Sequence, residues 1–229
     1  MEQHIVRLNC RDKEIILIGT AHISKRSAEQ VKEIIEAEKP DTVCVELDYQ
    51  RYLALTRGAP SDPPDLRRLI RRKKAPYALL SVLLGKMQKR LAADLNTVPG
   101  QEMLQAIQSA EAVGAELVLA DRDIRITLRR TWDSLSFFEK IKLLFQTAFG
   151  MRGAEITEAK LEEMQSPDSL TVLLNQFAAQ YPRLKQPLID ERDQYIARRI
   201  ITAPGEKIAA VVGAAHIPGI TKNLKDELI

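Results

Sequence analysis

The sequence lacks a long hydrophobic run, since no apolar stretch approaches the ~18 residues that suggest a membrane-spanning helix. Its first residues, Met1-Glu2-Gln3-His4, lack the basic and apolar regions of a secretory signal peptide. We therefore expect a cytoplasmic or membrane-associated protein, with no signal peptide or transmembrane segment in this chain. Cysteine is also scarce. Cys10 and Cys44 both lie in strand-like runs, so we expect buried thiols, and their spacing matches no zinc motif.

The remaining composition is that of a globular protein with a sizeable core. The chain has 229 residues, of which 45% are hydrophobic and 28% charged. These values are ordinary for a soluble α/β protein of one large domain or two small ones. We expect a single domain over residues 1–229.

The net charge of +3 conceals a basic segment. Between residues 51 and 100 there are eleven Lys or Arg against three Asp, a local charge of +8 (11 − 3). Such a surface favours an anionic membrane or an acidic partner, and a solvated helix face is the alternative. The apolar run 77–84 lies in the same segment, so residues 60–95 are expected to form a lid or membrane-facing element. A second subunit could also cover it. Nucleic acid is not expected as a partner.

Strand-like and helical segments alternate along the chain. The strands are expected at residues 4–9, 14–18, 42–45, 116–120 and 207–212. Helices are expected at residues 24–39, 101–114 and 187–201. This order predicts an α/β fold with a largely parallel central sheet flanked by helices. The helical insertions are a basic one at about residues 56–100 and a helical block at about 132–185.

Histidine is rare, with three residues in the chain. Two of them stand in near-copies of one phrase, Gly19-Thr20-Ala21-His22 and Gly213-Ala214-Ala215-His216, each after an apolar run. Imidazole is suited to metal ligation and to proton transfer near neutral pH. The repetition suggests that both ends of the chain meet at one chemical centre.

Four predicted strands end in reactive side chains. The ends carry His22, then Glu46 with Asp48, then residues 121–123, and finally His216. Ligands of an open parallel sheet bind beyond the carboxyl ends of its strands. Two imidazoles and one or two carboxylates form a plausible ligand set for a divalent transition metal. The sequence thus predicts one site along this edge.

Four side chains, Glu46 among them, are candidates for the same site. Glu46 ends an apolar run and must find a cation, a metal or an arginine; the alternative is that it caps the next turn or pairs with Arg51. Arg122 directly follows a strand, where a guanidinium could hold an oxyanion. Arg192 lies on the apolar stripe of its helix and should be paired inside or face a pocket. Glu191, beside that stripe, is either a site residue or a partner of the helix dipole.

These segments together resemble the TraB/PrgY family, within a wider group that includes TIKI proteases, erythromycin esterases and haem-binding ChaN proteins. The matching segments span nearly the whole chain: residues 19–22, 45–52, 120–129, 190–193 and 212–220. The resemblance implies an α/β fold with a metal-dependent hydrolase-like site that uses both histidines and the glutamate. TIKI relatives are metalloproteases, and PrgY-type members limit a peptide pheromone. Many TraB-like proteins continue into C-terminal transmembrane helices, so we expect this chain to be either a soluble domain of a longer parent that carries them or a short family member.

We therefore expect a metal-dependent hydrolase that cleaves a peptide or amide bond. His22, Glu46 and His216 would hold Mn, Co or Zn, which lowers the pKa of a bound water and polarises the scissile carbonyl. Glu191 would be the general base, and Arg122 or Arg192 would stabilise the oxyanion. One alternative is a non-catalytic module that sequesters a peptide or a haem-like ligand, with Tyr49 or Tyr52 as axial ligand. The other is a metal-independent, histidine-based esterase.

Overall fold

The computed structural model describes residues 4–20, 25–57, 100–136, 138–139 and 185–226. The chain divides into two compact units, the first made of residues 1–59, 97–123 and 189–229, the second of residues 60–96 and 124–188. Most of the predicted insertions, at about 56–100 and 132–185, and the segment 60–95 proposed as a lid lie outside the described residues. No helix in the described part of the chain is long and apolar enough to cross a membrane.

The first unit is built on a five-stranded sheet with the order β1-β2-β5-β3-β4. The strands are β1 (His4–Cys10), β2 (Lys13–Thr20), β3 (Thr42–Val45), β4 (Glu116–Leu119) and β5 (Lys207–Gly213). β1 and β2 form an antiparallel hairpin, whereas the pairs β2–β5, β5–β3 and β3–β4 are parallel. The prediction of a largely parallel α/β sheet is therefore confirmed.

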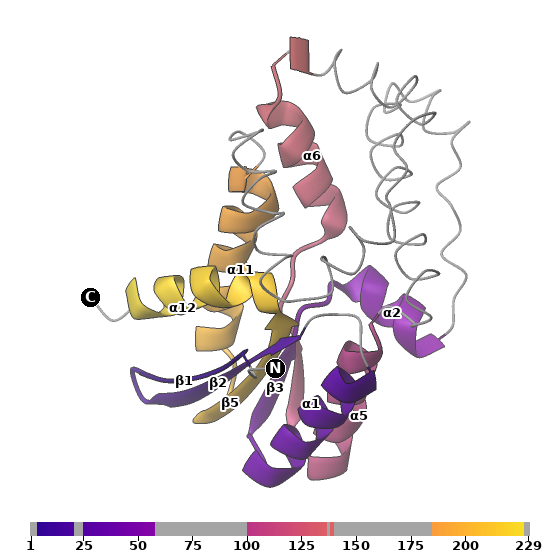
Figure 1. Ribbon diagram of the computed structural model, residues 1–229, viewed down its shortest axis with the longest axis vertical. Helices are drawn as coiled ribbons and strands as arrows, with labels where there is room; N and C mark the ends of the chain where they lie inside the picture. The colour runs from indigo at the N-terminus through magenta and orange to yellow at the C-terminus, as the bar shows by residue number, and fades with distance from the viewer. Residues whose placement is uncertain (1–3, 21–24, 58–99, 137, 140–184, 227–229) are drawn as a thin grey trace, which may run out of the picture. The chain divides into compact units, whose positions relative to one another are not determined.

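Helices cover both faces of this sheet (Figure 1). They are α1 (Lys25–Glu38), α2 (Tyr49–Arg57), α5 (Gln101–Val113), α11 (Glu191–Ile201) and α12 (Ile217–Asp226). A π-helical turn, Gln186–Asp190, precedes α11, and a short 3-10 turn, Ala214–His216, joins β5 to α12. In the second unit, α6 spans Ile124–Ser134. The sequence analysis predicted neither α6 nor α12, and it expected the helical block to begin only at about residue 132.

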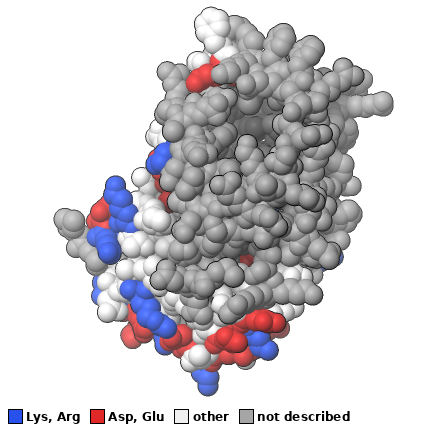
Figure 2. Space-filling view, in the orientation of Figure 1, with Lys and Arg blue, Asp and Glu red and all other residues white. Residues whose placement is uncertain are grey.

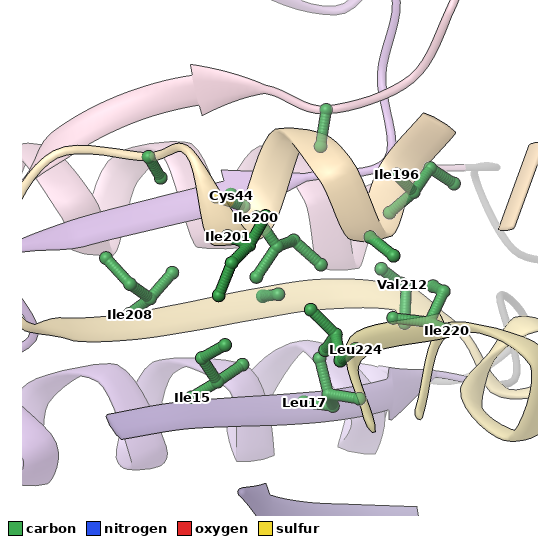
Figure 3. Packing of buried hydrophobic residues seen from close by; sticks show 14 of the residues in the cluster. Ile15, Leu17, Cys44, Ile196, Ile200, Ile201, Ile208, Val212, Ile220 and Leu224 are labelled. Carbon is green, nitrogen blue, oxygen red and sulfur yellow. The ribbon is translucent and has the colours of Figure 1, made fainter. Parts of the chain in front are cut away.

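Successive side chains of a strand point to opposite faces of the sheet, so the core forms one layer on each face. Ile15 and Leu17 of β2 pack with residues of α11 and α12, as Figure 3 shows for Ile196, Ile200, Ile220 and Leu224. The neighbouring β2 residues point to the other face, where the α1 and α5 side chains pack: Ile16, Ile18, Val31, Ile35, Met103 and Ala106. Because both faces are buried, the strands read as continuous apolar runs.

The amino ends of the strands are held by polar contacts. Asp41 accepts hydrogen bonds of 2.8 Å from the backbone N–H groups of Glu206 and Lys207. Glu38 pairs with both Arg7 and Lys207, each at 2.6 Å. Figure 2 shows basic and acidic side chains side by side on the described part of the surface. These contacts fix β5 against its neighbours at the end of the sheet opposite to the candidate site.

Candidate active site at the carboxyl edge of the sheet

Parallel pairing brings three strand ends to one edge of the sheet. Val45 is in register with both Leu119 of β4 and Val211 of β5. The residues that follow these strands therefore emerge together, as the sequence predicted. They include Glu46, Asp121 and His216, which are all buried.

Glu46 is tied to two other elements. Its Oε2 accepts a hydrogen bond of 2.7 Å from the backbone N–H of Gly213, at the end of β5. Its Oε1 accepts one of 2.6 Å from Nη2 of Arg192, on α11. The buried carboxylate thus finds the cation that its desolvation demands. The expected alternative partner, Arg51, bonds to other carboxylates.

Arg192 contacts three other side chains of this cluster. Besides Glu46, its Nη2 donates to Oδ2 of Asp121 at 2.7 Å, and its Nε lies 3.3 Å from Oδ1 of the same residue. Its Nη1 is 3.3 Å from Nε2 of His216. Burial opposes the charge on Arg192, but the Glu46 and Asp121 carboxylates outweigh burial and raise the pKa of the guanidinium. Arg192 is therefore a fixed cation, paired inside the protein as its position on the helix predicted.

The imidazole of His216 lies between two carboxylates. Its Nδ1 is 2.5 Å from Oδ1 of Asp193, and its Nε2 is 3.6 Å from Oε1 of Glu46. Burial disfavours the imidazolium, but Glu46 and Asp193 outweigh it and raise the pKa of His216. Burial raises the pKa of the Asp193 carboxyl, and its hydrogen bond with His216 acts in the opposite direction. Asp193 thus contacts the Nδ1 side of the ring, and Nε2 lies on the side of Glu46 and Arg192.

A second ring of charges surrounds this centre. Asp48 caps α2 by accepting the backbone N–H groups of Gln50 and Arg51, at 2.8 and 3.0 Å. The Arg51 side chain bonds to Asp48 and Asp121. Asp48 therefore has the two roles that were considered for Glu46: it caps the helix and it pairs with Arg51.

Arg122 and Glu191, two of the predicted catalytic residues, pair with each other. Nη1 of Arg122 is 2.9 Å from Oε2 of Glu191, and the two side chains are 8% and 21% exposed. Oε2 of Glu191 is therefore already occupied by a hydrogen bond from a guanidinium. This geometry favours an orienting function for the pair over general-base action by Glu191.

The structure thus brings Glu46, Arg192 and His216 into direct contact, whereas His22 lies outside the described residues. Asp193 was not among the predicted site residues. It precedes Ile196, Ala197 and Ile200 at helical spacing, and the structure shows that all four are buried. Asp193 therefore lies on the apolar side of α11, three residues before Ile196. A carboxylate is buried at such a position only when a hydrogen-bonding or charged partner lies beside it.

A divalent metal would find two donors among the described residues, His216 Nε2 and Glu46 Oε1. Their separation of 3.6 Å lets one ion contact both, and Asp193 on the other ring nitrogen matches the usual support of a ligating histidine. Within the described ranges, no group of three His, Cys, Asp or Glu is arranged to hold a metal. The predicted third ligand, His22, is not among them.

Comparison with known proteins places the chain in a family. The model of the TraB/PrgY/gumN family matches residues 5–227. An uncharacterized protein of Methanocaldococcus jannaschii is 34% identical over 216 residues, which are 93% of this chain and 53% of that protein. TraB domain-containing proteins of mouse and human are each 27% identical over 240 residues, covering 93% of this chain and 63% of theirs. The chain thus spans between half and two thirds of these relatives, and it belongs to the TraB/PrgY/gumN family.

Proposed function

We propose that this protein is a hydrolase that cleaves a peptide or amide bond at the carboxyl edge of its sheet. One observation carries the proposal: Nε2 of a buried histidine, braced by Asp193, faces the Glu46 carboxylate at 3.6 Å and the Arg192 guanidinium at 3.3 Å. A proton acceptor, a carboxylate and a fixed cation within one cluster are the groups that acyl transfer to water requires.

Each group has a task in this reaction. Nε2 of His216 takes a proton from the attacking water, and Asp193 stabilises the imidazolium that forms. Arg192 holds Glu46 and Asp121 in place, and the Arg122–Glu191 pair supplies a further guanidinium at the same edge. A guanidinium near the scissile carbonyl stabilises the oxyanion of the tetrahedral intermediate.

We propose further that a divalent transition metal, Mn, Co or Zn, assists the reaction. His216 and Glu46 would hold it together with His22, and the ion would acidify a bound water and polarise the carbonyl. The donor set supports this proposal, because a carboxylate on Nδ1 is the common support for a histidine that ligates through Nε2. Arg192 would have to give up its bond to Oε1 of Glu46 when the ion enters.

A metal-independent, histidine-based hydrolase is the second candidate. It is favoured by that same bond, because Arg192 already neutralises the carboxylate that a metal would need. Binding of a peptide or a haem-like ligand without catalysis is the third. Tyr49, 59% exposed directly after the edge residue Asp48, is its available axial ligand.

Cleavage of a mixed-sequence library of internally quenched peptides tests these candidates. The protein is assayed with added Mn²⁺, Co²⁺ or Zn²⁺ and with a chelator, and products are identified by mass spectrometry. We expect cleavage that falls by at least ~100-fold in Glu46→Gln and His216→Gln and is unchanged in Glu111→Gln, an exposed glutamate of α5. Cleavage that survives the chelator selects the metal-independent route. Saturable binding of haemin or peptide with no cleavage under any condition contradicts the hydrolase.

A further inference from the structure

Asp193 lies beside Gly219 of α12 as well as beside His216. A Cβ atom built on Gly219 would lie 1.9 Å from Oδ2 of Asp193 and 2.7 Å from its Cγ. The carboxylate therefore fills the space that any other residue at position 219 would occupy. Its other oxygen, Oδ1, lies 2.5 Å from Nδ1 of His216. The Asp193 carboxylate thus lies between Nδ1 of His216 and Gly219, the glycine three residues after His216.

The surroundings of this contact are rigid. Asp193 begins the buried stripe of α11, and Ile196 on that stripe packs in the same core cluster as Ile217 and Ile220 of α12. These isoleucines flank Gly219 and hold the first turn of α12 against α11. Asp193 itself is 3% exposed. Its carboxylate cannot move away from a new side chain at position 219 without leaving His216.

We propose that Asp193 is a positioning residue that fixes the neutral His216 ring with its proton on Nδ1, and that Gly219 is the residue that lets it do so. A neutral imidazole carries one proton, and a carboxylate at Nδ1 holds that proton there. The lone pair of Nε2 then faces Glu46 and Arg192. The inference rests on the proposed function, because both a metal and an attacking water need this lone pair.

The tautomer can be observed without any substrate. The chain has three histidines, so protein labelled with ¹⁵N-histidine gives a simple long-range ¹H–¹⁵N spectrum. The His216→Gln variant identifies the His216 signals by their loss. At a pH high enough to neutralise the ring, we expect a protonated Nδ1 and an unprotonated Nε2. In Asp193→Ala, we expect exchange between both tautomers.

Gly219→Ala is the sharper test, because residue 193 is unchanged. The added methyl should push the carboxylate off Nδ1 and give the same mixture of tautomers as Asp193→Ala. Lys222→Ala and Asp226→Asn, at exposed positions of α12, are the matched controls and should keep the native spectrum. A native tautomer in either Asp193→Ala or Gly219→Ala overturns the proposal.

A double variant covers the case in which Gly219→Ala folds but is too unstable for spectroscopy. Asp193→Gly combined with Gly219→Ala removes the clash, so we expect it to melt at a higher temperature than Gly219→Ala while still showing mixed tautomers. An equal or lower melting temperature overturns the steric link between the two residues.

Catalysis gives an independent readout. If the peptide assay detects cleavage, Asp193→Ala and Gly219→Ala should lower kcat by about 10- to 100-fold with little change in KM, as loss of a ligand's support does. A change in KM alone contradicts a positioning role. If no cleavage exists, the proposed function fails, whereas the spectra still decide the tautomer.

Discussion

Nη2 of Arg192 donates a hydrogen bond of 2.6 Å to Oε1 of Glu46, which joins α11 to the end of β3 inside the protein. The same nitrogen donates to Asp121, beyond the end of β4. One guanidinium therefore pairs with two carboxylates that are 6% and 2% exposed. Arg192 thus holds this edge of the sheet together and is also a candidate for chemistry.

We predict that Arg192→Met lowers the free energy of unfolding by about 3–5 kcal/mol, because it removes a cation that pairs with two buried carboxylates. Urea denaturation followed by circular dichroism measures this loss. Arg198→Met, at an exposed position of the same helix, should change the free energy by less than about 0.5 kcal/mol. Equal effects of the two substitutions would show that the buried pairing contributes nothing.

Both cysteines should be unreactive in the folded protein. Cys10 and Cys44 are buried thiols outside any disulfide, and burial raises the pKa of the Cys44 thiol to about 12. The thiolate is the nucleophile, so a neutral, inaccessible thiol reacts slowly. We expect an aromatic disulfide reagent at pH 8 to modify neither cysteine in native protein and both in denaturant. Rapid modification of Cys44 without denaturant would contradict the burial of β3.

The amino ends of the strands should produce a defined loss of stability in acid. The backbone N–H groups of Lys207 and Glu206 lower the pKa of the Asp41 carboxyl. A group whose pKa is lower in the folded state stabilises the fold above its unfolded pKa, about 3.9, and loses that contribution as the pH falls through its folded pKa.

Asp41→Asn should therefore flatten the dependence of stability on pH between about pH 4 and 2, the region below the unfolded pKa of an aspartate. Denaturation at a series of pH values measures the slope. Asp226→Asn, at an exposed position near the end of α12, serves as the control and should keep the native slope. An unchanged slope in Asp41→Asn would assign the acid sensitivity to other carboxylates.

The sheet and most of the candidate site could be predicted from the sequence, because both depend on local patterns. Apolar runs of four to eight residues located β2, β3, β4 and β5, and parallel pairing then placed Glu46 and His216 at one edge. Asp193 could not be located this way. Acids in the first turn of a helix usually serve the dipole, and only the packing of α11 on α12 reveals an imidazole beside it.

The pairing of charges also depended on tertiary structure. The sequence offers Glu46 both Arg51, five residues away, and Arg192, far along the chain. Arg51 lies on α2 and turns back to Asp48 at the helix start. Arg192 approaches because β5 lies between β2 and β3, an order that no local pattern specifies.

Glu46 and His216 are proposed to act together in one hydrolytic site. The most direct test is the rate of peptide cleavage by Glu46→Gln, His216→Gln and the double variant, each assayed at the same metal concentration. Substitutions of residues that act as a unit have non-additive effects on the rate. We therefore predict that the double variant is no slower than the slower single variant. Two independent losses that multiply in the double variant would contradict a shared site.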